Sequence, residues 1–117
     1  MAYVDGFVVA VPTANLEQYK QLATHACNVW IEHGALSYVE AYADDVPYGE
    51  LTSFPRAVQA KDDETVIFAW ITYSSRESRD EINQRVMGDE RMKSEAWKGV
   101  FDAQRMIYGG LKTFVEA

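Results

Sequence analysis

The sequence has little cysteine, the residue that forms disulfides and thiolate metal sites. Its 117 residues include one cysteine, Cys27, together with three prolines and seven glycines. A single cysteine cannot form an internal disulfide, and it excludes metal sites built from several thiolates. Such sparing use of cysteine is typical of a reducing compartment, and we expect a cytoplasmic protein.

Long apolar runs and positive charge are also scarce. No apolar stretch approaches the roughly 18 residues needed to cross a bilayer, and the first residues lack the basic region and apolar run of a signal peptide. Eleven Lys and Arg residues against eighteen Asp and Glu residues give a net charge of −7. Because phosphate groups are bound by clustered positive charge, we expect neither nucleic acid nor a membrane as a partner.

The motifs that identify common cofactor and catalytic sites are missing. The chain contains no P-loop, no G-x-G-x-x-G, no H-E-x-x-H and no G-x-S-x-G. We therefore expect no bound cofactor and no metal site. Whether the protein is an enzyme stays open at this point.

What is present indicates one domain, residues 1–117, with a substantial core. Hydrophobic residues make up 48% of the chain and aromatic residues 13%. Alternation predicts a strand over residues 3–11, and a helical period predicts a helix over residues 15–33 that Gly34 ends. Later segments are predicted as strands over 36–43, 57–60 (short), 65–73 and 106–115, a helix capped by Ser74 that ends at Gly88, and a short helix over 89–97.

The order of the main elements is βαββαβ, which predicts an α+β, ferredoxin-like protomer with an antiparallel sheet and its helices on one face. Side chains alternate across each strand, so the strand residues divide into two sets. The first set is small or aliphatic: Val4, Gly6, Val8, Val39, Ala41, Ile67, Ala69, Ile71, Ile107, Gly109 and Leu111. The second set is aromatic and carries two carboxylates: Tyr3, Asp5, Phe7, Val9, Tyr38, Glu40, Tyr42, Phe68, Trp70, Tyr108 and Phe114.

We expect the helices to cover the aliphatic set and to leave the aromatic set without cover. An apolar sheet face of that size is too large to face water in a monomer. A second copy of the chain is the expected cover, which gives a homodimer in which two sheets form a closed barrel. The alternative is that the short helix over residues 89–97 folds across this face within one chain.

Two carboxylates are the candidate catalytic residues, Asp5 and Glu40. Both lie in strand centres of the aromatic set, and a carboxylate removed from water is suited to general acid or base work. The alternative is that each accepts hydrogen bonds from tyrosine hydroxyls, Trp70 or the partner chain and fixes the interface. The candidate ligand-binding residues are Tyr3, Phe7, Tyr38, Tyr42, Phe68, Trp70 and Tyr108 in the cavity, with Arg56 and Arg105 at its rim for a carboxylate or phosphate group. For both arginines, salt bridges to the abundant acids are the alternative.

Several blocks of the chain together resemble the YbaA-like family of small bacterial proteins, a domain of unknown function (1428) in the dimeric α/β-barrel superfamily. The blocks are Tyr3-Val4-Asp5-Gly6-Phe7, His33-Gly34-Ala35-Leu36, Asp44-Asp45-Val46-Pro47-Tyr48-Gly49, Thr52-Ser53-Phe54-Pro55-Arg56 and Arg105-Met106-Ile107-Tyr108-Gly109-Gly110. The resemblance implies a ferredoxin-like protomer and a homodimer. It implies no substrate and no catalytic residues, because a shared fold does not determine an activity.

Three functional interpretations follow. The first is a small enzyme without a cofactor, monooxygenase- or isomerase-like, that acts on an apolar or aromatic molecule held between the two sheets. The second is a binding or stress-response module that uses the same pocket without catalysis. The third is a dimer whose aromatic side chains fill the barrel and leave no pocket.

Overall fold

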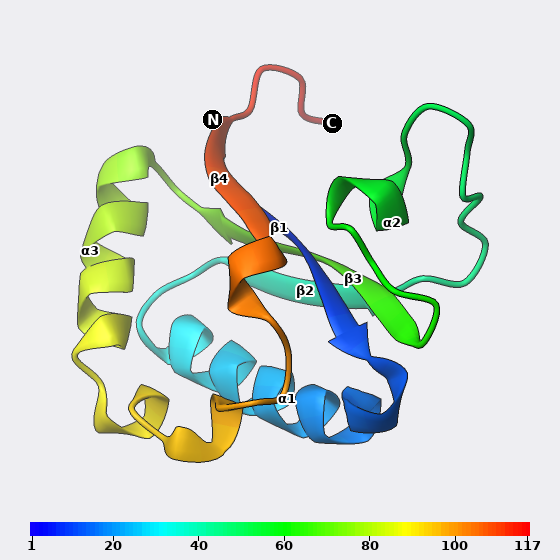
Figure 1. The fold of residues 1–117 in the computed structure, drawn as a ribbon. Coiled ribbons are helices and arrows are strands. Elements are labelled where there is room, and N and C mark those ends of the chain that lie inside the picture. Colours follow the sequence, from blue (N-terminus) through cyan, green and yellow to red (C-terminus); the bar gives the residue numbers. More distant parts are fainter.

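The chain forms one sheet with helices packed against it (Figure 1). In the computed structural model, which describes residues 1–117, the main elements are β1 (Tyr3–Pro12), α1 (Leu16–Glu32), β2 (Ser37–Tyr42), β3 (Glu64–Tyr73), α3 (Arg76–Met87) and β4 (Ile107–Lys112). All neighbouring strands are antiparallel, and their order in the sheet is β2-β3-β1-β4. The predicted α+β class and antiparallel sheet are confirmed, and the order is compatible with a ferredoxin-like fold. None of the helices combines the length and the apolar character needed to cross a membrane.

Short helical turns fill the connections. They are η1 (Thr13–Asn15), α2 (Phe54–Ala57), η2 (Glu90–Met92), η3 (Glu95–Trp97) and η4 (Ala103–Arg105). The predicted short strand over residues 57–60 is wrong, because residue 57 ends α2 and residues 58–59 form a turn. The Ser53 hydroxyl accepts from the Arg56 N–H at 3.2 Å and caps α2. The predicted helix over residues 89–97 is instead the two separate turns η2 and η3.

The predicted end of α1 is observed, whereas the predicted N-terminal cap of α3 is not. Gly34 has a φ of +113°, a left-handed conformation that suits glycine, so it ends α1 as predicted. The cap of α3 is Ser75 rather than Ser74, and its hydroxyl accepts from the Ser78 N–H at 3.0 Å. The helix therefore begins one residue later than the capping pattern predicted.

The register of the strands shows which residues share a face. Asp5 lies opposite Ile71, and Ile71 lies opposite Tyr38 on its other side, so Glu40 falls on the same face as Asp5. This part of the predicted division is confirmed. Residues 68 and 70 of β3, predicted to share that face, lie on the other one. The division had matched side chains by size and type, whereas the pairing register is what decides the face.

The helices cover the face that carries Asp5 and Glu40. The prediction that they cover the aliphatic set is therefore wrong for β1, β2 and β4, although Ile67, Ala69 and Ile71 of β3 do lie under the helices. Val29 of α1 and Ile82 and Val86 of α3 pack in one buried cluster with Ile71 and Tyr73. The rings of Trp97 and Phe101, which follow α3, contact Tyr19 of α1 edge-on. The alternative, in which residues 89–97 fold across this face within one chain, is closer to the structure. The physical reason is that the apolar stripes of α1 and α3 are buried against Ile67 and Ile71 of β3, which lie on the same face as Asp5.

The opposite face of the sheet is only partly covered. Val58, which follows α2, packs against Val8, Ala10 and Val66 at one end of it. Apart from the Phe54 ring of α2, which contacts the Phe68 ring edge-on at a centroid distance of 5.7 Å, no helix covers the remaining area. We call this area the open face: Val39, Phe68, Trp70, Ile107 and Leu111. Phe68 is 41% exposed, Ile107 45% and Leu111 60%.

Candidate functional site

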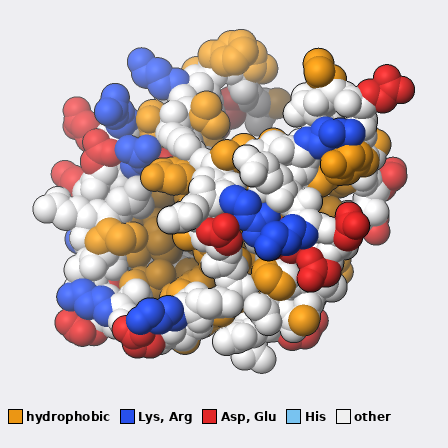
Figure 2. All heavy atoms as spheres, viewed as in Figure 1, with side chains coloured by type: hydrophobic (Ala, Val, Ile, Leu, Met, Phe, Trp, Pro, Cys, Tyr) orange, Lys and Arg blue, Asp and Glu red, His pale blue; other side chains and the backbone are white.

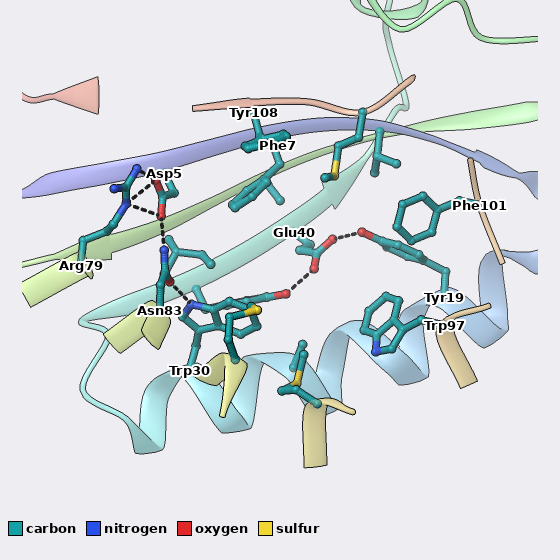
Figure 3. Close-up of a pocket in the computed structure, with 18 residues that line it drawn as sticks. Asp5, Phe7, Tyr19, Trp30, Glu40, Arg79, Asn83, Trp97, Phe101 and Tyr108 are labelled. Carbon is teal, nitrogen blue, oxygen red and sulfur yellow. Dashed lines mark hydrogen bonds and ion pairs between the residues drawn. The ribbon is translucent and has the colours of Figure 1, made fainter. Parts of the chain in front are cut away.

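A cavity of about 420 Å³ lies between the sheet and the helices (Figure 3). Of its 18 lining residues, 14 are hydrophobic. The larger side chains include the rings of Phe7, Tyr19, Trp30, Tyr38, Trp97, Phe101 and Tyr108 and the thioethers of Met87, Met92 and Met106. In the space-filling view the surface is hollowed between α1, α3 and β4, with hydrophobic side chains inside the hollow (Figure 2). The size and apolar lining suit a small organic molecule.

Asp5 lies at one end of the cavity, and both oxygens of its carboxylate accept hydrogen bonds. The Arg79 Nε–H donates to Oδ1 at 3.0 Å and to Oδ2 at 3.2 Å, and Nη2 forms an ion pair with Oδ1 at 3.0 Å. The Tyr73 hydroxyl donates to Oδ2 at 3.0 Å, and the Asn83 amide donates to the same oxygen at 3.4 Å. The Trp30 indole N–H in turn donates to Asn83 Oδ1 at 3.1 Å. The carboxylate is 5% exposed and compensated in charge, so it holds β1 to α3.

Glu40, in the middle of the cavity, has a different environment. The Tyr19 hydroxyl donates to Oε1 at 2.5 Å and the Tyr38 hydroxyl donates to Oε2 at 2.6 Å (Figure 3). Both oxygens of the Glu40 side chain therefore act as hydrogen-bond acceptors. No Lys or Arg forms an ion pair with Glu40. Its negative charge is therefore held by two neutral phenols alone.

The two phenols are kept protonated by their surroundings. Burial, followed by the nearby charge of Glu40 and the hydrogen bond to it, raises the pKa of Tyr19 well above its ordinary value. The same causes raise the pKa of Tyr38. Both side chains consequently act as hydrogen-bond donors to Glu40 across the whole physiological range.

A second hollow of about 410 Å³ adjoins the first and shares Tyr19, Tyr38 and Glu40 with it. It lies against α1 and β2, the strand at the edge of the sheet, and it is also lined by Lys20 and Cys27. Burial and the charge of Glu40 raise the pKa of the Cys27 thiol, which favours the unreactive protonated form. Glu40 and its two phenols thus form the partition between the two hollows.

The structure brings five of the candidate site residues together and separates the others. Asp5, Phe7, Tyr38, Glu40 and Tyr108 line the cavity. The strands of Asp5 and Glu40 are not neighbours, since β3 lies between them, so their backbones are roughly 10 Å apart and the two carboxylates work separately.

The remaining aromatic candidates lie elsewhere. Tyr3 is buried in the core beside Tyr73, under the Arg79 guanidinium. Tyr42 lines the adjoining hollow. Phe68 and Trp70 lie on the open face, their ring centroids 5.6 Å apart. The predicted aromatic cavity is thus divided between the two faces of the sheet.

Neither arginine candidate faces the cavity. Arg105 donates to Glu64 Oε1 at 2.8 Å and to Oε2 at 2.7 Å, and to Asp102 at 3.0 Å, so its salt-bridge alternative is the one observed. Arg56 donates to the carbonyls of Tyr48 and Gly49 and lies 3.9 Å from the centre of the Tyr48 ring. It orders the long loop before α2.

Sequence reasoning missed Arg79 and Asn83, the two polar residues that α3 contributes to the cavity. A signal for them existed. Arg79 lies three residues before Ile82, and Asn83 lies three residues before Val86, so all four share the buried stripe of the helix. No periodic signal marks Trp97 or Phe101, because they follow irregular turns. No group of three or more His, Cys, Asp or Glu side chains is arranged to hold a metal ion.

The arrangement is suited to holding an apolar molecule against an acceptor. A family model described as "Protein of unknown function (DUF1428)" matches residues 2–103. The chain is 47% identical over 116 residues to "Uncharacterized protein YbaA" of Escherichia coli strain K12, with 99% of each chain covered. The protein of the same name from Shigella flexneri matches with the same identity and coverage.

Proposed function

This chain belongs to the DUF1428 family of proteins of unknown function, and we propose that it binds a small, largely apolar molecule between its sheet and helices. Glu40 then accepts a proton from the bound molecule. The observation that carries the proposal is the carboxylate held between two phenols, with no cation paired to it, in an aromatic cavity of about 420 Å³. The ligand site is thus formed within one protomer, and not between two sheets as the sequence predicted.

Proton transfer is the reaction that these side chains can complete by themselves. Glu40 would take a proton from an acidic C–H or O–H of the bound molecule, while the electron pair of the broken bond stays on the molecule and is delocalised over its conjugated system. Protonated Glu40 accepts less strongly from Tyr19 and Tyr38, so their hydroxyls can turn to donate to the new anion. Return of the proton at another atom gives an isomer, and no further reactant is consumed.

The test is a ligand screen followed by exchange. Native mass spectrometry against a library of small conjugated molecules identifies ligands, and proton NMR in D₂O measures exchange at their acidic position. We expect binding by the wild type, and a rate of exchange that falls by about 100-fold or more in Glu40→Gln while binding stays measurable. Glu50→Gln, at an exposed loop residue, is the matched control and should exchange as the wild type does.

Two results would overturn this proposal in different ways. Binding without any exchange above the buffer rate would leave a non-catalytic binding module, the second of the interpretations given above. Failure of every library member to bind would contradict the cavity as a ligand site.

We further propose that two copies of the chain pair through their open faces. Val39, Phe68, Ile107 and Leu111 are each at least 36% exposed on one continuous sheet surface, and water contact with such an apolar patch is unfavourable. Pairing of the two sheets would give the dimeric α/β barrel that the sequence predicts. Its interior would then be lined by Phe68 and Trp70, and each protomer would keep its own cavity outside the barrel.

Sedimentation at micromolar concentration tests the pairing. The wild type is expected at twice the mass of the chain, and the double variant Phe68→Asp/Leu111→Asp at the mass of one chain with unchanged far-UV circular dichroism. Leu51→Asp is the control, because Leu51 is 92% exposed in a loop away from the sheet. A monomeric wild type would contradict the dimer and would leave the cavity proposal intact.

A further inference from the structure

We infer that the cavity selects aromatic molecules that carry a hydrogen-bond donor, such as a phenolic hydroxyl or an aromatic amine, and excludes aromatic anions. This inference rests on the proposed binding function and specifies the chemical class of the ligand. Its basis is the hydrogen-bonding capacity that remains unused around Glu40.

The donors next to Glu40 are already occupied. Tyr19 and Tyr38 each have one hydroxyl proton, and each donates it to a different oxygen of the carboxylate. What remains free is acceptor capacity: the lone pairs of both phenol oxygens and the remaining lone pairs of the carboxylate. A ligand group that reaches this point must therefore donate a hydrogen bond.

The charges around the cavity add a second selection. Arg79 is the one cation that lines it, and its guanidinium is shared between Asp5 and Asp80. Lys20 lies in the adjoining hollow, with its ammonium 4.7 Å from the centre of the Tyr42 ring. Two carboxylates and one guanidinium leave the cavity with a net negative charge. An anionic group beside Glu40 would meet a like charge among apolar side chains, where such repulsion is poorly screened.

The walls favour a flat aromatic body. Phe7 and Tyr108 lie nearly parallel, with ring centroids 6.4 Å apart and planes at 22°. Trp30 and Trp97 present further ring surface, and Met92 and Met106 supply polarizable sulfur next to it. The preferred ligand is consequently a planar ring system with one hydroxyl or amine directed at Glu40.

Three probes with the same ring system separate these contributions: 2-naphthol as the donor, naphthalene without a polar group, and 2-naphthoate as the anion. Isothermal titration calorimetry on the wild type is expected to show 2-naphthol binding about tenfold more tightly than naphthalene, with 2-naphthoate the weakest. In Glu40→Gln the amide is both donor and acceptor. The preference for 2-naphthol should fall to about threefold or less and 2-naphthoate should bind more tightly, while naphthalene is unchanged. Glu50→Gln should keep the wild-type order.

The order of the three affinities in the wild type tests the inference without any variant. Equal affinities, or 2-naphthoate as the tightest ligand, would overturn it while leaving the cavity as a binding site. If none of the three probes binds, the proposed function itself is contradicted. If naphthalene binds Glu40→Gln normally and the 2-naphthol preference persists, Glu40 is not the acceptor, and the inference fails at that residue.

Discussion

Two parts of the cavity, its end at Asp5 and its middle at Glu40, contain the same chemical group in opposite circumstances. Asp5 is 5% exposed and pairs with Arg79, Tyr73 and Asn83. Glu40 is half-buried and has two neutral phenols but no cation. The difference indicates that a carboxylate matched in charge serves the fold, and that an unmatched one remains available for a ligand. Sequence position alone could not separate them, because both lie within strands on one face of the sheet.

The largest expected effect comes from removing the cation at the matched end. Arg79→Met leaves the Asp5 charge buried without its partner and should lower the free energy of unfolding by about 3 to 5 kcal/mol. Urea unfolding followed by far-UV circular dichroism measures the loss. The double variant Asp5→Asn/Arg79→Met should recover part of it, because the unpaired charge is gone. A loss below about 1 kcal/mol would show that the pair does not hold β1 to α3.

Glu64, at the start of β3, is a second carboxylate paired with an arginine. Its effect on stability depends on pH, which gives a further test of the comparison. Hydrogen bonds from Arg105, and to a lesser degree from the Lys61 N–H, lower the pKa of Glu64 to about 2. Since this folded-state pKa lies below the unfolded value of 4.5, the stability it contributes is complete above about pH 4.5 and is lost as the pH falls toward 2.

Glu64→Gln removes this dependence. Between about pH 6 and pH 3 the free energy of unfolding should fall by about 1 to 2 kcal/mol more in the wild type than in the variant. The figure is below the full conversion of the pKa difference because the measurement stops at pH 3, above the folded-state pKa of about 2. Chemical unfolding of both proteins across this pH range checks it. Parallel pH curves would contradict the matched pair.

The smallest effect on stability is expected at Glu40, the carboxylate without a cation. Glu40→Gln keeps an acceptor for one phenol, so the free energy of unfolding should change by about 1 kcal/mol or less. Thermal or urea unfolding measures this directly, with Glu50→Gln as the control. A loss as large as that of Arg79→Met would mean that Glu40 is a structural group like Asp5, and the distinction between the two carboxylates would disappear.

The sequence predicted the elements well and the covered face poorly. The order of strands and helices follows from hydrophobic periodicity, and the alternation that joined Asp5 with Glu40 agrees with the register. The side of β3 that faces the helices depends on pairing with β1, where Phe7 meets Ala69, and no local pattern specifies that pairing. Arg79 was overlooked as a partner for Asp5 because a charged helix residue ordinarily faces water, although its spacing from Ile82 placed it on the buried stripe.

The location of the ligand is the central claim, and the three tryptophans test it within one spectrum. Trp30 and Trp97 line the cavity, whereas Trp70 lies on the open face of the sheet. In a ¹⁵N-labelled sample, addition of 2-naphthol should shift the indole N–H signals of Trp30 and Trp97 and leave that of Trp70 unchanged. A shift of Trp70 alone would place the ligand between two sheets and would contradict the cavity beneath the helices.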